Sequence, residues 1–151
     1  MRELEQEVRR LRDIEDIRRL LLEYGRTLDQ RKFADYSNLF AHDGEWVGVG
    51  TIGSAQGPAA IQAFMEKNIG VAPVRCNHLM TNMLIDVDAD SATAWSRWTL
   101  IDAAANDTPA LIYSGHYDDL LTRENGAWKF RRRIAWVDIP NVSQAHPAPE
   151  R

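Results

Sequence analysis

The order of two periodicities along the chain constrains its fold more than any other feature. Between Leu4 and Leu28, apolar residues recur mostly at intervals of three and four, which is the period of an amphipathic helix. The second half instead contains β-rich stretches separated by turn signals, which predict strands over residues 74–88, 91–101, 111–123 and 128–137. Helices followed by consecutive strands indicate an α+β fold, with the helices packed on one face of a curved antiparallel meander.

Shorter signals predict the remaining elements. A second, short helix is expected over residues 32–40, and the Gln56-Gly57-Pro58 turn leads into a third helix that has proline at its first position and ends near Gly70. Asn125-Gly126 is the strongest hairpin signal in the chain, because both residues adopt the left-handed conformations that a tight turn requires. These signals place three helices before the strand-rich region.

Size and charge restrict the classes of partner. The chain has 151 residues, of which 44% are apolar, so it can form one domain, expected over residues 1–139 with a loosely ordered tail over 140–151. The net charge of -4 argues against nucleic acid as a partner. No apolar run approaches the roughly 20 residues needed to cross a bilayer, so no membrane partner is expected. The single cysteine, Cys76, excludes an intrachain disulfide and suits a cytoplasmic location.

A histidine in an alternating stretch is the first candidate for chemistry. In residues 76–82, a period of two places Cys76, His78, Met80 and Asn82 on one face of a strand. If this face lines the concave side of the sheet, His78 lies among apolar and amide side chains that can tune it for proton transfer. The alternative is a buried histidine that is hydrogen-bonded for purely structural reasons.

Two residues near the end of the first helix are further candidates. Asp29 closes the helix, where its carboxylate could orient a histidine through the ring N–H and stabilise the imidazolium. Tyr24 lies five residues earlier and could donate its hydroxyl proton to a substrate oxygen. The structural alternatives are a polar helix end for Asp29 and an aromatic core residue for Tyr24.

The predicted strand over residues 91–101 and the tryptophans supply possible pocket walls. Trp98 and Asp102 share a face by the same alternation, which makes Asp102 a further candidate, and the second acidic one after Asp29. Trp46, Trp98, Met80 and Trp136 could form apolar walls around a ligand, although such residues more often belong to a core.

The other histidines and the glycines suggest no further chemistry. His42 is expected in a solvated turn and His146 in the tail, while His116 has no comparable setting. No pair of histidines has the spacing of a zinc site, and the chain has no phosphate-binding loop, dinucleotide fingerprint or nucleophile elbow. We therefore expect neither a metal nor an organic cofactor.

Taken in order, several short motifs resemble the SnoaL-like branch of the nuclear transport factor 2 (NTF2)-like superfamily over roughly residues 11–137. The motifs are Tyr24 with Leu28-Asp29, the sequence NLFAHDGEW at 38–46, Gln56-Gly57-Pro58 with Ile61, NHLMTN at 77–82 and NGAWKF at 125–130. The resemblance implies a cone in which N-terminal helices pack on a highly curved antiparallel sheet and enclose a pocket for a small organic molecule. It also implies a homodimer or homotrimer.

Three enzyme groups of this superfamily carry an aspartate at the end of the first helix and a histidine on a later strand. They are scytalone dehydratase, bile-acid 7α-dehydratase and hexachlorocyclohexane dehydrochlorinase, and the two positions fall on Asp29 and His78. Tyr24 is similar to the tyrosine of the bile-acid enzyme, and Asp102 to its further aspartate. Scytalone dehydratase, however, has a second catalytic histidine where this chain has Asp102, so its exact substrate does not transfer.

The resemblance to the dehydrochlorinase extends further but is also incomplete. It includes Trp46, Cys76 two residues before the histidine, and the Thr81-Asn82 pair after it. The dehydrochlorinase has a lysine at the position of Tyr24, so its exact substrate does not transfer either. Ketosteroid isomerases of the same fold place their general base at the position of Gly48, which argues against that activity here.

The resemblance implies a cofactor-independent lyase, either a dehydratase or a dehydrohalogenase, acting on a small cyclic substrate by β-elimination. His78 would remove a C–H proton with Asp29 holding its tautomer, and Tyr24 would polarise a carbonyl or assist the leaving hydroxide. The expected substrate-binding residues are Asp102, Trp46, Trp98, Cys76, Met80 and Asn82. The alternatives are an isomerase or cyclase with the same dyad, a β subunit like that of ring-hydroxylating dioxygenases, and a non-catalytic small-molecule binding protein.

Overall fold

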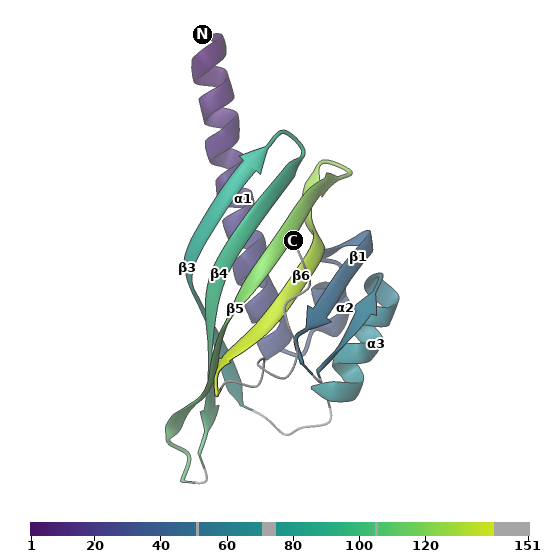
Figure 1. Ribbon diagram of the computed structural model, residues 1–151, viewed down its shortest axis with the longest axis vertical. Helices are drawn as coiled ribbons and strands as arrows, with labels where there is room; N and C mark the ends of the chain where they lie inside the picture. The colour runs from purple at the N-terminus through teal and green to yellow at the C-terminus, as the bar shows by residue number, and fades with distance from the viewer. Residues whose placement is uncertain (51, 71–74, 105, 141–151) are drawn as a thin grey trace.

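The computed structural model describes residues 1–50, 52–70, 75–104 and 106–140. Its helices are α1 (Arg2–Asp29), α2 (Phe33–Ser37) and α3 (Pro58–Asn68). Its strands are β1 (Phe40–Gly48), β2 (Gly53–Gln56), β3 (Cys76–Asp88), β4 (Ser91–Ala103), β5 (Pro109–Glu124) and β6 (Ala127–Ile139). In these residues the strands form one curved, open sheet in the order β2-β1-β6-β5-β4-β3, with α1 lying across one face (Figure 1).

The predicted α+β architecture is confirmed, with differences in detail. The long first helix and the four strands of the second half form close to their predicted bounds. The second helix ends at Ser37 rather than at Phe40, because Phe40 begins β1 and pairs with Phe130 of β6. His42 therefore lies in a strand and not in a turn, although its side chain is exposed as predicted. The short strand β2 was not predicted.

The sheet is mixed, whereas an antiparallel sheet was predicted. β3 to β6 form the expected antiparallel meander, but β1 runs parallel to β6, with Val47 opposite Ile134. The reason is topological: β1 is joined to the meander through β2 and α3, so it is not tied to β6 by a hairpin that would fix an antiparallel direction.

The hairpin between β5 and β6 forms at the predicted turn. Asn125 has φ 52° and Gly126 has φ 80°, as a two-residue turn with both central residues in the left-handed region requires. The predicted tail lies outside the described residues from 141 onward, as does His146, so the division of the chain at residue 139 stays a prediction. Among the described helices, none is long and apolar enough to cross a membrane.

The core lies between α1 and the concave face of the sheet, where the helix contacts β3 and β6. Burial of this apolar surface is the main source of stability for a domain of this size. The residues exposed by 2% or less include Ile17, Leu21, Tyr24, Tyr36, Phe40, Ile61, Met65, Leu121 and Phe130.

Asp13 marks the point where α1 enters the body of the domain. Its carboxylate is buried and accepts hydrogen bonds from Arg123 Nη2 at 2.6 Å and from Trp128 Nε1 at 3.2 Å. Burial alone would raise the pKa of Asp13, but the hydrogen bonds and the positive charge of Arg123 hold this pKa below its ordinary value. The ionised carboxylate therefore stabilises the folded state.

We expect Asp13→Asn to lower the free energy of unfolding by about 1–3 kcal/mol at neutral pH. Because the folded pKa of Asp13 is depressed, its contribution is present above the unfolded pKa and is lost as pH falls through the folded pKa. Urea unfolding at several pH values should show that the difference in free energy of unfolding between the wild type and Asp13→Asn becomes smaller as pH falls. Asp16→Asn, on the exposed face, is the control, and equal stability of both variants would contradict this account.

Candidate active site

His78 and Asp29 form a hydrogen-bonded pair between β3 and the end of α1. His78 Nδ1 lies 2.5 Å from Asp29 Oδ1, and the backbone N–H of His78 donates to Asp29 Oδ2 at 2.8 Å. The side chains are only 11% and 17% exposed. With ionised Asp29 as acceptor, Nδ1 carries the proton of the neutral ring, so the lone pair is at Nε2. The predicted pairing of these two residues is present in the structure.

A close approach of helix to strand makes this pair possible. Gly25, one turn before Asp29, faces β3 so closely that an added Cβ would lie 3.3 Å from Met80 Cγ and 3.4 Å from His78 Cβ. A larger side chain would push α1 away from the strand. Gly25 therefore allows the carboxylate at the helix end to reach both the ring and the backbone of His78.

The predicted alternation of β3 is correct for the first three residues of the site face. Cys76, His78 and Met80 are half-buried, while Asn77 and Leu79 between them are exposed. Met80 lies opposite Trp98 on β4, and the rings of His78 and Trp98 are 6.1 Å apart. The histidine thus has apolar and aromatic neighbours on the sheet.

Asn82 does not share the face of His78, which corrects the prediction. The β3–β4 register shifts between Thr81 and Leu84, and Asn82 has φ 53° and an exposed side chain. This is a β-bulge, and its extra residue moves the inward position from Asn82 to Met83. A period of two predicts the face of a strand only as far as its first bulge.

Tyr24 lies fully inside the domain, with 1% of its surface exposed. Its hydroxyl oxygen accepts a hydrogen bond from Trp46 Nε1 at 3.0 Å, and its ring contacts those of Tyr36, Tyr117 and Phe130. The Trp46 N–H occupies one lone pair of the oxygen, and the hydroxyls of Tyr36 and Tyr117 are neighbours of the Tyr24 hydroxyl. Tyr24 and Trp46, predicted separately, are therefore direct partners.

Arg133 is a buried cation whose position the sequence left open. Its side chain has no exposed surface, and its guanidinium carbon lies 4.0 Å from the centroids of the Tyr24 and Tyr117 rings. Nε and Nη2 donate to Asp119 at 2.7 and 2.6 Å. Among the described residues, Nη1 has no hydrogen-bond partner. One side of this buried guanidinium is therefore without a hydrogen-bond acceptor among the described residues.

A bulge in β6 turns the side chain of Arg133 toward the interior. Sequence alternation predicts that at most one or two side chains of the Arg131–Arg133 run can reach a pocket, with most of the run solvated or at an interface. In the structure the β5–β6 register shifts so that Leu121 pairs with Phe130 and Leu120 with Arg132. Arg131 is the extra residue and is exposed, and Phe130 and Arg133 both point inward although they are three residues apart.

Trp98 and Asp102 lie on the predicted face of β4. The indole of Trp98 is 6% exposed and packs over Gly115, where an added Cβ would lie 2.7 Å from the ring. Asp102 is half-buried and lies opposite Cys76 in the β3–β4 pairing. Burial, followed by the negative charges of Asp29 and Asp102, raises the pKa of the Cys76 thiol.

We expect Cys76 to react slowly with iodoacetamide near neutral pH, because its raised pKa keeps the thiol protonated. Asp29→Asn removes one of the two nearby negative charges and should increase the alkylation rate roughly twofold to tenfold, as followed by mass spectrometry. Asp118→Asn, on the outer face of the sheet, should leave the rate unchanged. An unaltered rate in Asp29→Asn would contradict the electrostatic contact between these groups.

Trp136 does not line the interior, which corrects another expectation. It lies on the outer face of the sheet, where its ring stacks on that of His116 with centroids 5.5 Å apart. His116 Nδ1 lies 2.8 Å from Asp138 Oδ2, so this histidine also has a carboxylate partner. A third pair, His42 with Glu124, is on the surface, and the His42 side chain is 81% exposed.

The sequence and structure of this domain match known proteins. The family model described as SnoaL-like domain matches residues 9–134, which is most of the chain. The chain belongs to the SnoaL-like domain family. This confirms the predicted family within the NTF2-like superfamily.

Similar proteins agree with this assignment. An uncharacterized protein of Mycobacterium tuberculosis, Rv2910c, is 27% identical over 121 residues, which cover 79% of this chain and 81% of the relative. An NTF2-like protein with a cystatin-like fold from Novosphingobium aromaticivorans has a TM-score of 0.83 and 26% identity over 91% of this chain and 89% of its own. A candidate scytalone dehydratase from the same bacterium has a TM-score of 0.73 and 28% identity, covering 85% of each chain.

A group of possible metal ligands coincides with the dyad of this SnoaL-like domain. One donor atom each from Asp29, Cys76 and His78 lie within 4.8 Å of one another. The donor chemistry fits a cation poorly, because Nδ1 of His78 is hydrogen-bonded to Asp29 and the raised pKa of Cys76 disfavours the thiolate. The arrangement is better suited to proton transfer.

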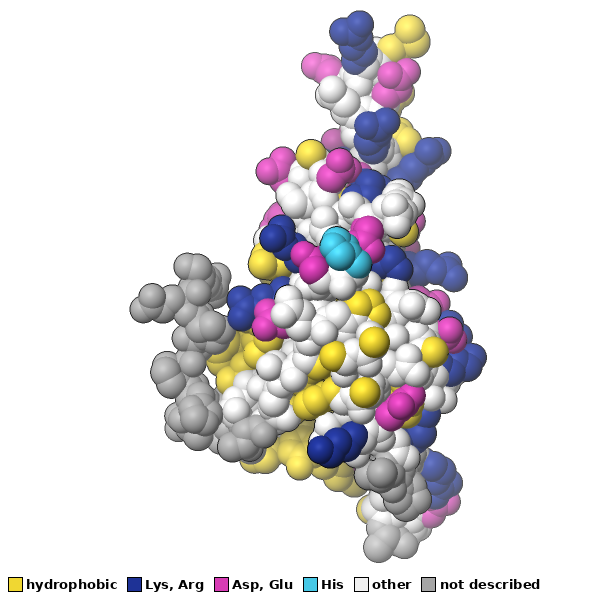
Figure 2. All heavy atoms as spheres, turned by 90° about the vertical axis from the view of Figure 1, so that its right-hand side faces the viewer, with side chains coloured by type: hydrophobic (Ala, Val, Ile, Leu, Met, Phe, Trp, Pro, Cys, Tyr) yellow, Lys and Arg dark blue, Asp and Glu magenta, His cyan; other side chains and the backbone are white. Residues whose placement is uncertain are grey.

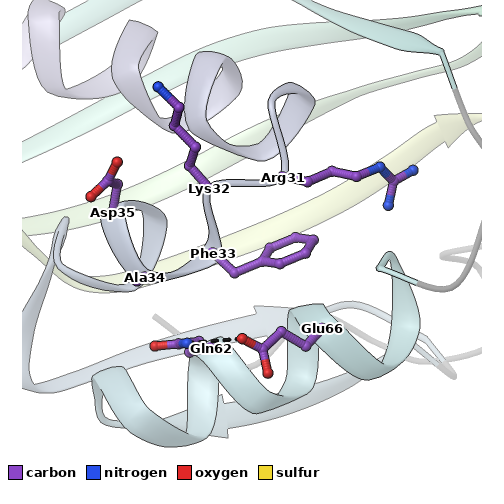
Figure 3. Close-up of a pocket in the computed structure, with 7 residues that line it drawn as sticks. All are labelled: Arg31, Lys32, Phe33, Ala34, Asp35, Gln62 and Glu66. Atoms are coloured by element: carbon purple, nitrogen blue, oxygen red, sulfur yellow. Dashed lines mark hydrogen bonds between the residues drawn. The ribbon is translucent and has the colours of Figure 1, made fainter.

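A surface hollow of about 380 Å³ lies between α3 and the link from α1 to α2 of the SnoaL-like domain (Figure 3). Gln62 and Glu66 of α3 are hydrogen-bonded to each other at 2.8 Å along one wall, and Phe33 lies opposite them. The lining residues are Arg31, Lys32, Phe33, Ala34, Asp35, Gln62 and Glu66. None of the predicted site residues lines this hollow, so we do not assign the chemistry to it.

Proposed function

We propose that the protein is a cofactor-independent lyase that catalyses β-elimination from a small cyclic substrate, releasing water or halide. The observation that carries this proposal is the inward-facing His78–Asp29 pair. Its hydrogen bond occupies Nδ1 and leaves the Nε2 lone pair of His78 as a base. General base catalysis contributes about 10²–10⁴-fold to a rate, and orientation of the substrate must supply the remainder.

The surroundings of the three histidine–carboxylate pairs favour His78 as the base. His42 is on the surface. His116 is held between the rings of Trp95 and Trp136 on the outer face of the sheet. His78 is the one that faces α1 and the aromatic interior, where a substrate can be enclosed and water excluded.

The proposed step moves one proton and one leaving group. Nε2 of His78 takes a proton from an acidic C–H bond, and the electrons of that bond form a C=C double bond to the adjacent carbon. The leaving group departs from this carbon with its bonding pair, as halide or as hydroxide that is protonated to water. Ionised Asp29 stabilises the imidazolium formed on His78, and proton loss to solvent then restores the base.

Two buried groups can stabilise the negative charge that develops on the substrate. The hydroxyl of Tyr24, whose oxygen already accepts from Trp46, can donate to a carbonyl oxygen or to a leaving hydroxide. Arg133 Nη1 has no partner among the described residues and can donate to the same atom or to a halide. Burial raises the pKa of neighbouring Tyr36 and Tyr117, so both hydroxyls remain protonated donors.

The aromatic walls indicate an apolar ring as the substrate. Trp46 and Trp98 are each 6% exposed and flank Tyr24 and His78. Asp102, half-buried opposite Cys76, can position a substrate hydroxyl. The candidate scytalone dehydratase with 28% identity supports a dehydration reaction. The lone thiol of Cys76 fits the reducing cytoplasm, where we place the protein.

A screen of hydroxylated and halogenated cyclic ketones and cycloalkanes tests the proposed function. Product masses should show loss of water or of hydrogen halide, with a new double bond, and EDTA should not reduce the rate. Rearranged products of unchanged mass would indicate an isomerase or cyclase instead. Saturable binding with no conversion of any compound would support a binding protein and contradict the lyase.

A further inference from the structure

The first turns of α1 form an arm that extends beyond the body of the domain. Residues 1–12 are all exposed, and burial begins at Asp13. The arm, Arg2–Arg12, is therefore about 16 Å long. Figure 1 shows the arm projecting past the sheet, and Figure 2 shows exposed side chains of both charges along it. Isolated helices of this length are marginal in water, so an exposed helical arm gains stability from a partner.

The arm carries an apolar stripe that points away from the domain core. Leu4, Val8 and Leu11 are 69%, 39% and 55% exposed. At 100° per residue around the helix axis, these three side chains point within about 60° of one another. The core-facing residues of α1 are centred roughly 150° away around the same axis. The stripe is thus a separate apolar surface, although in the sequence it continues the same spacing as the core positions.

The stripe has the spacing of a coiled-coil seam and ends at the body of the domain. Leu4, Val8 and Leu11 follow intervals of four and three, and the next positions on this line are Glu15 and Arg18, which form an ion pair. Pairing of α1 along its whole length would bury these charges. The apolar contact is therefore confined to the arm.

Apart from Arg2 at its start, the arm carries its charges in two blocks of opposite sign. Glu3, Glu5 and Glu7 occupy the first turns, and Arg9, Arg10 and Arg12 the following ones. A parallel, in-register pair of arms would place like charges at the same level. An antiparallel pair would place the acidic block of each arm against the basic block of the other.

We propose that the arm is a self-association surface, which pairs antiparallel with the arm of a second copy of this chain. Leu4, Val8 and Leu11 form the apolar seam. Glu5 and Arg12 lie on the same flank of that seam, and equivalent flanks face each other in an antiparallel pair. Glu5 therefore faces Arg12 of the partner subunit. This inference is independent of the proposed catalytic activity.

Sedimentation equilibrium over a wide range of protein concentration tests this surface. Val8→Glu combined with Leu11→Glu should weaken dimerisation at least about 100-fold, because both apolar positions occur twice in the interface. Glutamate is a good helix former, so far-UV circular dichroism should show the arm still helical. Gln6→Glu adds a negative charge on the opposite side of the arm and should leave dimerisation unchanged. A wild type that stays monomeric, or self-association that survives the double substitution, would overturn the proposal.

Charge reversal tests the orientation. Glu5→Arg and Arg12→Glu should each weaken dimerisation roughly tenfold, and both together in one chain should restore it. In a parallel coiled coil Arg12 would instead face Glu7 of the partner subunit, so the combined swap would not restore association. Failure of restoration would therefore contradict the antiparallel arrangement.

Discussion

His78→Ala should lower kcat/KM for the substrate identified in the screen by about 10²–10⁴-fold while the protein remains folded. The ring of His78 supplies the only proposed base, and its Nδ1 is already used by Asp29 at 2.5 Å. Asp29→Asn should also reduce kcat/KM, because an amide cannot stabilise the imidazolium and no longer selects the reactive tautomer. Steady-state kinetics, with circular dichroism to verify folding, measure both effects.

A second histidine provides a matched control for this result. His116 also contacts a carboxylate, Asp138, but lies on the outer face of the sheet. His116→Ala should therefore keep kcat/KM close to that of the wild type. If His116→Ala and His78→Ala reduced activity equally, the assignment of the base to the interior would be wrong.

Arg133→Met should lower the free energy of unfolding by about 3–5 kcal/mol, the cost typical of leaving a buried charge without its partner. Asp119, whose side chain is also fully buried, would lose both of its hydrogen bonds to the guanidinium. Burial already raises the pKa of Asp119 even with Arg133 in place. Urea unfolding of the variant and of the exposed control Arg131→Met measures the difference, and the control should change by less than about 0.5 kcal/mol.

The deficit of Arg133→Met, meaning its loss of free energy of unfolding relative to the wild type, should increase as pH rises. Without Arg133, the folded pKa of Asp119 rises further above its unfolded value, so the folded state binds the proton more tightly. The stability of the variant is then greatest below the unfolded pKa of Asp119 and is lost as pH rises through the folded pKa of Asp119. The deficit should therefore be smaller near about pH 4 than at about pH 7. A deficit independent of pH would contradict the burial of an unpaired carboxylate.

Local patterns predicted the secondary structure and most of the candidate site. The carboxylate at the end of the long helix and the alternation around His78 were sufficient to place Asp29, His78, Cys76 and Met80 together. Asp29 ends a regular helix, and Cys76, His78 and Met80 lie at the start of β3, before its bulge. The turn at Asn125-Gly126 was predicted equally well, because its conformation depends on two residues alone.

The wrong prediction for Asn82 and the open position of Arg133 have the same physical cause, a bulge in the sheet. One bulge moved Asn82 out of the site, and another brought Arg133 inward three residues after Phe130. Bulges depend on strand pairing across the sheet, which local sequence periodicity does not contain. The parallel pairing of β1 with β6 is likewise a long-range property of the fold. The apolar stripe of the arm and the core-facing residues of α1 point in nearly opposite directions. This difference becomes clear only when the helix is placed on the sheet.

Hydrogen exchange at carbon tests the central claim, that His78 is a base for C–H protons, without requiring a leaving group. Cyclic ketones with the ring skeletons of the screened compounds, but without hydroxyl or halide substituents, would be incubated in D₂O with each protein, and α-deuteration would be followed by NMR. We predict deuteration above the buffer rate with the wild type and His116→Ala, and its loss in His78→Ala. Deuteration at the buffer rate with the wild type, or an equal rate in His78→Ala, would contradict the account.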